Sequence, residues 1–388
     1  MLDILLALFC LIWVIVALNV VREIKSISIF ESIIPTRTIV APKLSIVIAA
    51  CNEELTIKDA VNTISQQSYP DIEIIVVNDR SKDNTGKIID ELSTIDSRIK
   101  AVHVESLPSG WLGKVHALHK GVSIATGEWI LFTDADVHFQ VTALQRAVDY
   151  SIERNLDHLA IVPKILNPNK NFWLDVTLIT SLTTFIQIVK PSSIENIGSS
   201  AYAGSGGFNL VRRSAFDKTL GFEWLKMEVI DDVGLGLMLK RQGCSTSLLI
   251  SNRDISVVWY HTLNEMIKGL EKNSFLGSTQ GKLSKLLALL FFLLLYISAP
   301  ILAFLLGAGY AKITGVIALL FFAISAIYTA NRLKLNVFHL MLRPIGLLIL
   351  SVILCRSAFK NLKQGGIYWR GTFYSMKELL NGQRVKKF

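Results

Sequence analysis

Long apolar runs lie at both ends of the chain, and shorter apolar runs alternate with amphipathic segments between them. Residues 4–21 form one unbroken apolar run, which is followed directly by Arg22 and Lys25. A run of this length is typical of a helix that crosses the hydrocarbon core of a bilayer, roughly 30 Å thick. Because the basic residues follow the run, we expect residues 1–22 to be an uncleaved transmembrane anchor with the middle of the chain on the cytoplasmic side.

Three more apolar runs lie near the carboxyl end, at residues 286–306, 313–330 and 337–355. They predict two to three membrane segments within residues 284–356, followed by a basic juxtamembrane tail over 357–388. The third run contains His339, Arg343 and Pro344, which are unfavourable in the middle of a bilayer. Three full crossings would also place the tail opposite the middle domain, where the charge rule disfavours it. We therefore expect the third segment to be shallow or broken.

The middle of the chain alternates between strand and helix patterns. Strands are predicted at residues 44–50, 72–78, 99–104 and 129–133, and helices at 53–67, 83–92 and 114–125, with Asn52 placed to cap the first helix. This alternation indicates an α/β domain with a mostly parallel sheet and flanking helices, which we place at residues 43–280. The segment Phe172–Val189 is apolar but too polar to span a membrane. It predicts either an interfacial helix beside an acceptor entrance or a core helix of the domain.

Composition supports this division into membrane and soluble parts. Apolar residues make up 51% of the chain and charged residues 18%, against roughly 25% charged in soluble proteins, which excludes an ordinary soluble enzyme. The net charge is +9, and residues 356–388 hold eight Lys and Arg against one acid. Such a tail favours an anionic membrane surface, and we expect no nucleic-acid partner because the middle domain has no basic patch interleaved with aromatics. The four scattered cysteines predict buried thiols in a reducing compartment.

Polar clusters follow three of the predicted strands. Asn52 and Glu53 come after the first strand, Asp79 after the second, and Asp134 and Asp136 after the fourth. The carboxyl ends of parallel strands meet at one edge of a sheet, where α/β proteins bind ligands. Carboxylates that converge there are costly unless a cation or a polyhydroxyl ligand lies among them. Helix capping explains any one cluster equally well, but it explains all three together poorly.

Two of these positions are suited to a metal ion and one further residue to an anion. Asp134 and Asp136 are spaced so that both carboxylates can share one divalent cation and leave positions for phosphate oxygens. Lys114 follows Gly113 at a predicted helix start, where the helix dipole disfavours a cation. A bound anion such as a diphosphate would make the lysine favourable there, and the alternative is a solvated lysine.

Glycines and a pair of acids follow in the second half of the domain. Gly206 and Gly207 precede a strand-like run and allow a ligand to approach the backbone closely. Asp231 and Asp232 open a later helix, where the dipole keeps a carboxylate ionised. An ionised carboxylate in such a place suits a general base, and a plain helix cap is the alternative.

In this order, the motifs resemble those of the family 2 glycosyltransferases with the GT-A fold. The resemblance covers residues from about Leu44 to Asn273 and rests on the segments Ala50–Glu54, Val77–Thr85, Gly113–Leu118 and Phe132–Asp136. The flanking apolar runs and three further segments look like the membrane-bound subgroup that includes hopanoid-associated and carotenoid glycosyltransferases. These segments are Trp111–Lys114, Glu265–Asn273 and Tyr368–Gly371. The resemblance implies a GT-A nucleotide-diphospho-sugar transferase domain with transmembrane helices at both ends.

The resemblance also implies roles for individual residues. The donor-binding residues would be Asn52, Glu53, Asp79, Lys114 and Asp134. Asp136, together with Asp134, would hold Mg²⁺ or Mn²⁺, and Gly206 and Gly207 would contact the acceptor. Asp232 would be the catalytic base, but the usual Glu-Asp pair of the family is Asp231-Asp232 here, so the choice between the two acids stays open.

The implied activity is the inverting, metal-dependent transfer of a sugar from a nucleotide diphosphate sugar to a membrane lipid. The protein would be integral to the cell membrane, with its catalytic domain in the cytoplasm. The QxxRW motif of processive polymer synthases is absent after Asp232, which disfavours a polymerase. Two alternatives stay open, namely a glycosyltransferase that contributes to a secreted or cell-surface polysaccharide, and a non-catalytic membrane scaffold with a GT-A-like fold.

Overall fold

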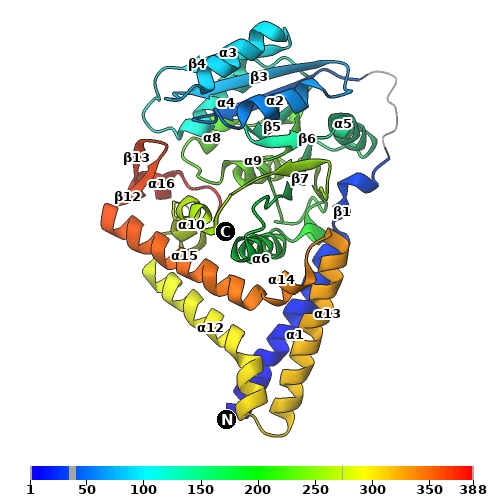
Figure 1. Cartoon of the computed structure of the whole chain (residues 1–388), viewed down its shortest axis with the longest axis vertical. Coiled ribbons are helices and arrows are strands. Elements are labelled where there is room, and N and C mark those ends of the chain that lie inside the picture. Colours follow the sequence, from blue (N-terminus) through cyan, green and yellow to red (C-terminus); the bar gives the residue numbers. More distant parts are fainter. Residues whose placement is uncertain (1, 35–40, 273, 387–388) are drawn as a thin grey trace.

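A central eight-stranded sheet organises the part of the molecule farthest from the amino terminus (Figure 1). The structure, a computed structural model, describes residues 2–34, 41–272 and 274–386, so Lys387 of the basic tail lies outside it. The spatial order of the strands is β1 (Ser28–Ile29), β10 (Thr246–Ile250), β7 (His158–Val162), β9 (Asn209–Arg212), β5 (Trp129–Asp134), β2 (Leu44–Ala50), β3 (Ile72–Asp79) and β4 (Ile99–Val104). Only β9 runs antiparallel to its neighbours, so the sheet is mostly parallel, as predicted.

Both faces of the sheet are covered, because alternate side chains of each central strand enter different apolar clusters. On β2, Ile46 and Ile48 join the cluster formed with α2 (Ile57–Ser65) and α5 (Ala143–Glu153), whereas Val47 joins the cluster on the opposite face. That opposite face is covered by α4 (Gly113–Ile124), α8 (Phe222–Leu225) and α9 (Asp231–Arg241). Strands buried on both sides read as continuous apolar runs, which is why the sequence pattern predicts them well.

The remaining elements surround this core. Two small sheets contain β6 (Val137–Phe139), β11 (Ile255–Val257) and β8 (Lys164–Ile165), and β12 (Gly366–Trp369) with β13 (Thr372–Ser375). The other short helices of the domain and tail are η1 (Phe30–Ser32), α3 (Thr85–Ile95), η2 (Pro191–Ser193), α7 (Arg213–Phe216), α10 (Leu263–Leu270), α11 (Ser274–Thr279) and α16 (Met376–Gly382).

One local prediction is wrong, because Asn52 does not cap the first helix of the domain. That helix, α2, begins at Ile57, four residues later than an Asn52 cap would require, and its cap residue Thr56 makes no side-chain cap bond. Asn52 has a positive φ of 57°, and its amide oxygen accepts a hydrogen bond from the Lys82 backbone N–H at 2.8 Å. Asn tolerates this left-handed conformation, which turns its side chain toward the next loop.

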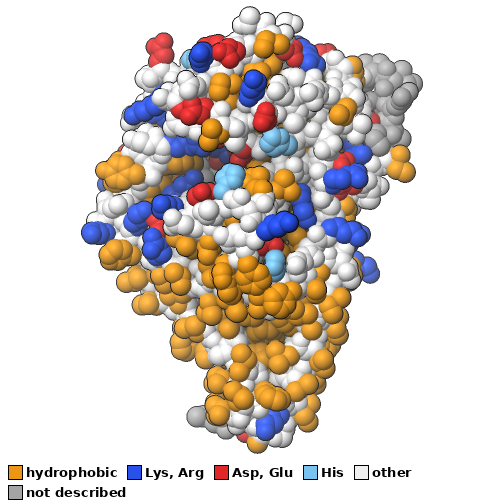
Figure 2. Space-filling model, viewed as in Figure 1, with side chains coloured by type: hydrophobic (Ala, Val, Ile, Leu, Met, Phe, Trp, Pro, Cys, Tyr) orange, Lys and Arg blue, Asp and Glu red, His pale blue; other side chains and the backbone are white. Residues whose placement is uncertain are grey.

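An apolar stalk of three helices extends away from the domain (Figure 1). The stalk consists of α1 (Leu2–Ser26), α12 (Leu283–Leu306) and α13 (Tyr310–Leu333). Small side chains at the contact allow close packing, since a Cβ added to Gly315 would lie 3.1 Å from the Ala303 Cβ. Figure 2 shows that hydrophobic side chains cover the outside of this part of the molecule, which suits it to lipid rather than to water.

Two further helices lie between the sheet and the stalk. The helix α6 (Phe172–Val189) has the bounds of the predicted apolar segment, and it packs against α15 (Arg343–Gln364) and α1. With the three stalk helices, they make five helices among the described residues that are long and apolar enough to cross a membrane. The expectation that the segment Phe172–Val189 is too polar to span is therefore wrong by length and composition. The predicted third carboxyl-terminal segment is broken, because α14 (Val337–Met341) ends just before α15 begins at the Arg343-Pro344 step.

The basic tail returns to the domain. After α15, Arg370 bonds to Glu53 at 2.8 Å, and the Arg384 and Val385 backbone N–H groups donate to Glu228 at 2.6 and 2.9 Å. The described tail and the domain therefore lie on the same side of the stalk, which removes the conflict between the number of apolar runs and the charge rule. Cys355 on α15 is exposed, in contrast to the prediction that all four thiols are buried.

Three carboxylates, the buried Glu23 and Glu271 and the half-buried Glu31, connect the apolar helices and the segment after α1 to the domain. Glu23, near the end of α1, accepts hydrogen bonds from the Ser192 backbone N–H at 2.9 Å and from its hydroxyl at 3.0 Å. Glu31 accepts from the backbone N–H groups of residues 252–254. Glu271 pairs with Arg356 and Lys360 of α15. Each acid is thus tied to a different segment of the chain.

A fourth buried carboxylate, Glu73 on β3, holds the sheet at the ends of its strands opposite the acidic clusters. It is 3% exposed, and it accepts hydrogen bonds from the Ser45 hydroxyl (2.6 Å), the Thr126 backbone N–H (2.6 Å) and the Lys100 ammonium (2.6 Å). Burial alone would raise its pKa, but these bonds outweigh burial and lower the pKa to about 2. Glu73 therefore joins these segments most strongly when it is ionised.

We predict that Glu73→Ala lowers the free energy of unfolding by about 3 kcal/mol, because buried donors lose their acceptor. The matched control is Glu91→Ala, which removes an exposed carboxylate 3.9 Å from Lys87 and should cost less than about 0.5 kcal/mol. The measurement is chemical unfolding in detergent, followed by tryptophan fluorescence.

The same bonds predict an acid dependence. The unfolded pKa of Glu is about 4.3 and the folded pKa is about 2, so the contribution is complete above about pH 5 and is lost as the pH falls toward 2. The stability difference between wild type and Glu73→Gln should therefore shrink between pH 7 and pH 3. A difference that stays constant over this range would contradict the assignment.

Candidate active site

A cavity of about 680 Å³ opens at the carboxyl ends of β2, β3 and β5. The structure brings most of the predicted site residues to its wall, namely Glu53, Asp79, Lys114, Asp134, Asp136, Gly206, Gly207, Asp231 and Asp232. The acids and Lys114 come from the carboxyl ends of β2, β3 and β5 or the turns after them, and from the starts of α4 and α9, whereas Gly206 and Gly207 come from the segment before β9. This is the sheet edge at which α/β proteins bind ligands. Asn52 is not among the lining residues, because its side chain faces residue 82.

Lys114 is the charge at the centre of this wall. Its ammonium lies 2.7 Å from an Asp134 oxygen and 3.4 Å from an Asp231 oxygen, so it is not a solvated lysine. Burial alone would lower the pKa of Lys114, but Asp134, Asp231 and Asp232 outweigh burial and raise it. Burial raises the pKa of Asp231 above its ordinary value, and Lys114 opposes that rise. Lys114 therefore stays charged and favours the ionised forms of the acids beside it.

Asp232 faces the cavity more openly than Asp231, which is 5% exposed. Its two oxygens accept hydrogen bonds from the Gly206 backbone N–H at 2.8 Å and from the Val233 backbone N–H at 2.9 Å. The helix α9 begins at Asp231, so Ile230 holds the cap position and both acids lie in the first turn. The two backbone hydrogen bonds hold Asp232 in a fixed orientation.

Two glycines let the segment that precedes β9 lie close to these acids. A Cβ added to Gly206 would lie 2.5 Å from an Asp134 oxygen, and one added to Gly204 would lie 1.8 Å from the Asp232 backbone oxygen. Gly207 packs as closely on Pro163, with 2.3 Å to a ring carbon. Any side chain at these positions would displace the carboxylates or the backbone that carries them. The glycines are thus required by the packing of the wall.

Asp136 is the carboxylate best placed to receive a cation. Burial raises its pKa above the ordinary value, and the negative charges of Asp134 and Glu53 add to that rise. A divalent cation between Asp134 and Asp136 would remove this repulsion. No three His, Cys, Asp or Glu side chains converge on one point among the described residues. The pair therefore fits a Mg²⁺ or Mn²⁺ ion whose remaining ligands are waters and substrate phosphates.

Three basic residues also line the cavity, and the sequence analysis did not identify them as site residues. Arg80 pairs with Asp79 at 2.8 Å, and Arg370 of the carboxyl-terminal hairpin pairs with Glu53 at 2.8 Å. Lys272 lies over the Trp369 ring at 4.6 Å. Burial, together with Arg370 and Lys114, lowers the pKa of Lys272 to about 8.

These basic residues would be stabilised by a bound anion, since one would offset their mutual repulsion. The resemblance of Tyr368–Gly371 to a membrane-bound subgroup was the one sequence observation that pointed toward this hairpin. The pairing of Arg370 with Glu53 spans 317 positions, so no local pattern contains it.

Comparison with known proteins identifies the domain. Residues 45–220 match the family model described as Glycosyl transferase family 2, so this part of the chain carries a family 2 glycosyl transferase domain. The 4,4'-diaponeurosporenoate glycosyltransferase of Staphylococcus aureus is 23% identical over 342 residues, which cover 86% of this chain and 89% of that protein. The Beta-monoglucosyldiacylglycerol synthase of Trichormus variabilis is 28% identical over 201 residues, covering 51% of this chain and 41% of that protein.

Other curated relatives match over shorter regions. Six proteins from Haemophilus influenzae, Bacillus subtilis and Streptococcus pneumoniae, all with glycosyltransferase names, are 30% to 40% identical, but this chain spans only 23% to 44% of their length.

The fold is shared with a solved structure, the mannosyltransferase PcManGT from Pyrobaculum calidifontis in complex with GDP-Man and Mn²⁺. The TM-score is 0.54 at 16% sequence identity, and the match covers 92% of this chain and 99% of that chain. The predicted GT-A-like α/β fold is therefore confirmed.

We predict that Gly204→Ala destabilises the protein by about 2–3 kcal/mol or more, because the added methyl group overlaps the Asp232 backbone. Gly198→Ala is the matched control, since the nearest atom to its added Cβ, an Asn196 oxygen, is 3.5 Å away. This control should change stability by less than about 0.5 kcal/mol. Equal thermal midpoints for the two variants in detergent would contradict the close contact between Gly204 and the start of α9.

Proposed function

We propose that the protein is an inverting, metal-dependent glycosyltransferase that moves a sugar from a nucleotide diphosphate sugar to a membrane lipid. One observation carries this proposal. A single cavity at the carboxyl edge of a GT-A-like sheet combines a carboxylate pair, a candidate base and a set of basic residues, and its wall includes α6 beside the apolar stalk. The family 2 domain match supports the same activity.

The donor would lie with its diphosphate between the basic residues and the Asp134–Asp136 pair. Lys272 and Arg370 are close enough to influence each other's charge, and two nearby cations suit a diphosphate better than a neutral group. Glu53 and Asp79 would hydrogen-bond ribose and base from the loops after β2 and β3. A cation on Asp136 and Asp134 would neutralise charge on the departing nucleoside diphosphate. The similar mannosyltransferase contains GDP-Man and Mn²⁺, which supports this choice of ligands.

Asp232 would act as the base. Its carboxylate accepts the proton of the acceptor hydroxyl as that oxygen forms a bond to the anomeric carbon. The bond between this carbon and the diphosphate oxygen breaks, and its electron pair leaves with the nucleoside diphosphate. A single displacement from the opposite face inverts the configuration. Asp231 is held by Lys114 instead, so we assign it to positioning the lysine rather than to proton transfer.

The acceptor would enter from the membrane side. Leu182 and Phe185 of α6 line the cavity together with residues 204–207, and the same helix packs against α15 and α1. Basic residues lie at or next to the ends of α1, α12 and α13 that are nearest the domain, at Arg22, Lys25, Lys282, Lys285, Arg332 and Lys334. This distribution favours a cytoplasmic domain with its active site at the membrane surface. The names of two relatives, a carotenoid-acid glycosyltransferase and a diacylglycerol glycolipid synthase, support a lipid acceptor.

The test uses the purified full chain in detergent, with UDP- and GDP-sugars, a membrane lipid extract and Mn²⁺ or Mg²⁺. We predict a new glycolipid whose formation stops with a chelator and resumes when the cation is restored. Asp136→Asn and Asp232→Asn should each lower kcat by about 10²-fold or more. Asp59→Asn, at an exposed position on α2, is the control and should leave the rate unchanged.

Other outcomes would separate the alternatives. Full activity in Asp232→Asn with loss in Asp231→Asn would move the base to Asp231. Activity in the presence of a chelator would contradict the metal assignment. A polysaccharide product would favour the surface-polymer alternative, and no transfer from any donor would favour the scaffold.

A second prediction concerns donor binding. Lys272→Gln should raise the KM for the nucleotide sugar about tenfold, the loss of one charge-assisted contact of about 1.4 kcal/mol, with a smaller effect on kcat. Lys272→Arg should retain most of the affinity. Lys268→Gln is the control, because this exposed lysine lies four positions earlier and does not line the cavity. An equal rise in KM for Lys268→Gln would mean a general charge effect instead.

A further inference from the structure

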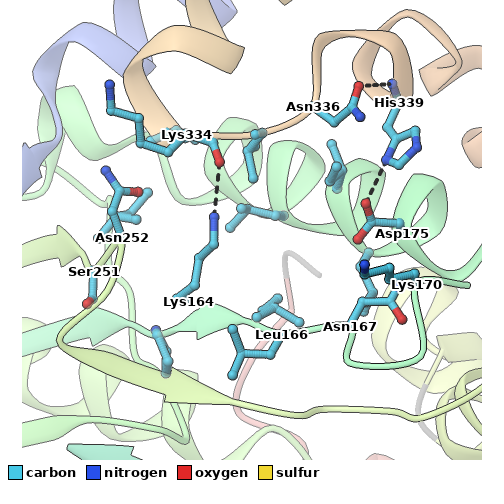
Figure 3. Close-up of a pocket in the computed structure, with 18 of the residues that line it drawn as sticks. Lys164, Leu166, Asn167, Lys170, Asp175, Ser251, Asn252, Lys334, Asn336 and His339 are labelled. Carbon is cyan, nitrogen blue, oxygen red and sulfur yellow. Dashed lines mark hydrogen bonds and ion pairs between the residues drawn. The ribbon is translucent and has the colours of Figure 1, made fainter. Parts of the chain in front are cut away.

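A second cavity, of about 380 Å³, lies where the domain meets the stalk. Its walls come from residues 163–167 around β8, from the first half of α6 and from the connection between α13 and α14, with residues 250–252 closing one end. Figure 3 shows side chains from these separate segments directed toward one space. Pro163, Ile165 and Leu182 line this cavity and also the active-site cavity, so the two are neighbours.

Lysines dominate the charge around this cavity. Lys164, Lys170 and Lys334 line it, and the Lys164 ammonium points across it to donate to the Lys334 backbone oxygen at 3.2 Å (Figure 3). Asp175, the one acid in the lining, is bonded to His339 at 2.6 Å. The nearby Glu31 carboxylate is occupied by hydrogen bonds from residues 251–254. These hydrogen bonds leave both carboxylates charged, and their charges oppose the fall in the pKa of Lys164 that burial causes. The lining itself still carries three lysines against one aspartate.

About half of the lining is apolar, and this part continues toward the stalk. Leu178, Ile179 and Leu182 of α6 face Leu333 and Leu335 across the cavity. Ile179 also packs with Ala330 of α13, so the apolar wall begins at the upper end of a stalk helix. A cavity with cations at one side and aliphatic side chains at the other is complementary to an amphiphile with an anionic headgroup.

We propose that this cavity binds the phosphate of an anionic membrane phospholipid, with the lysines around the phosphate and the first part of the acyl chains along α6. The inference is independent of the proposed sugar transfer, because it requires neither the carboxylate cluster nor a donor. Three observations support a lipid rather than a soluble anion. The cavity lies at the level where the stalk meets the domain, half of its lining is aliphatic, and a stalk helix forms one wall.

The test measures binding to the full chain in a neutral detergent. Dioctanoyl phosphatidylglycerol is added, and the thermal midpoint is followed as a function of lipid concentration. We expect a saturable rise for wild type and a curve shifted to at least tenfold higher lipid concentration for Lys164→Gln/Lys334→Gln. Lys334→Gln alone, at an exposed position, should give a smaller shift and guards against misfolding of the double variant. Lys58→Gln/Lys218→Gln makes the same charge change at two exposed positions outside the cavity and should behave as wild type.

Three further arms decide what the site recognises. Dioctanoyl glycerol and dioctanoyl phosphatidylcholine should give little or no shift, since they lack the net negative charge. Inorganic phosphate should also give little, since it lacks the acyl chains. An equal response to inorganic phosphate, to the zwitterionic lipid or in the double variant would each overturn the proposal.

Discussion

Lys114 brings one ammonium group into a wall that otherwise consists of carboxylates, and the arrangement of that wall depends on its charge. Asp134 ends a strand and Asp231 begins a helix almost one hundred positions later, yet both lie within 3.4 Å of the same nitrogen. Burial would otherwise drive these acids toward their neutral forms. Lys114 pairs with Asp134 and Asp231 but not with Asp136. The Asp136 carboxylate lines the cavity, where it could bind a divalent cation. The closely packed glycines at 204 and 206 keep the backbone near enough for Asp232 to share the same space.

The connection between the domain and the apolar helices relies on polar contacts for a related reason. The stalk helices expose aliphatic side chains over most of their surface, so apolar contact alone would not specify which part of the domain they meet. Glu23, Glu31 and Glu271 supply that specificity, since each accepts directed hydrogen bonds or ion pairs from one particular segment. The orientation of the sheet relative to the stalk is thereby set by a few acids.

The sequence predicts those parts of the molecule whose physical causes are local. The strand β2 and the helix α6 have the predicted bounds, because continuous burial and an uninterrupted apolar segment leave a direct trace in composition. The break before α15 follows from Pro344 and its charged neighbour. Asn52 was misplaced because its positive φ depends on the loop it meets. Lys272 and Arg370 were missed because their surroundings are assembled from distant segments, and the same distance hides the lysine-lined cavity.

The hairpin of β12 and β13 has a consequence for how the protein is made. The hairpin contacts the cavity wall at two points. Arg370 donates a hydrogen bond to Glu53, and the Tyr374 hydroxyl accepts a hydrogen bond from the Gly113 backbone N–H at 3.3 Å. During synthesis these residues leave the ribosome after α12, α13 and α15. The cavity wall is therefore completed only once the apolar helices have been translated, so a nascent domain released early would present an unfinished pocket. Chain order thus places completion of the pocket after synthesis of these helices.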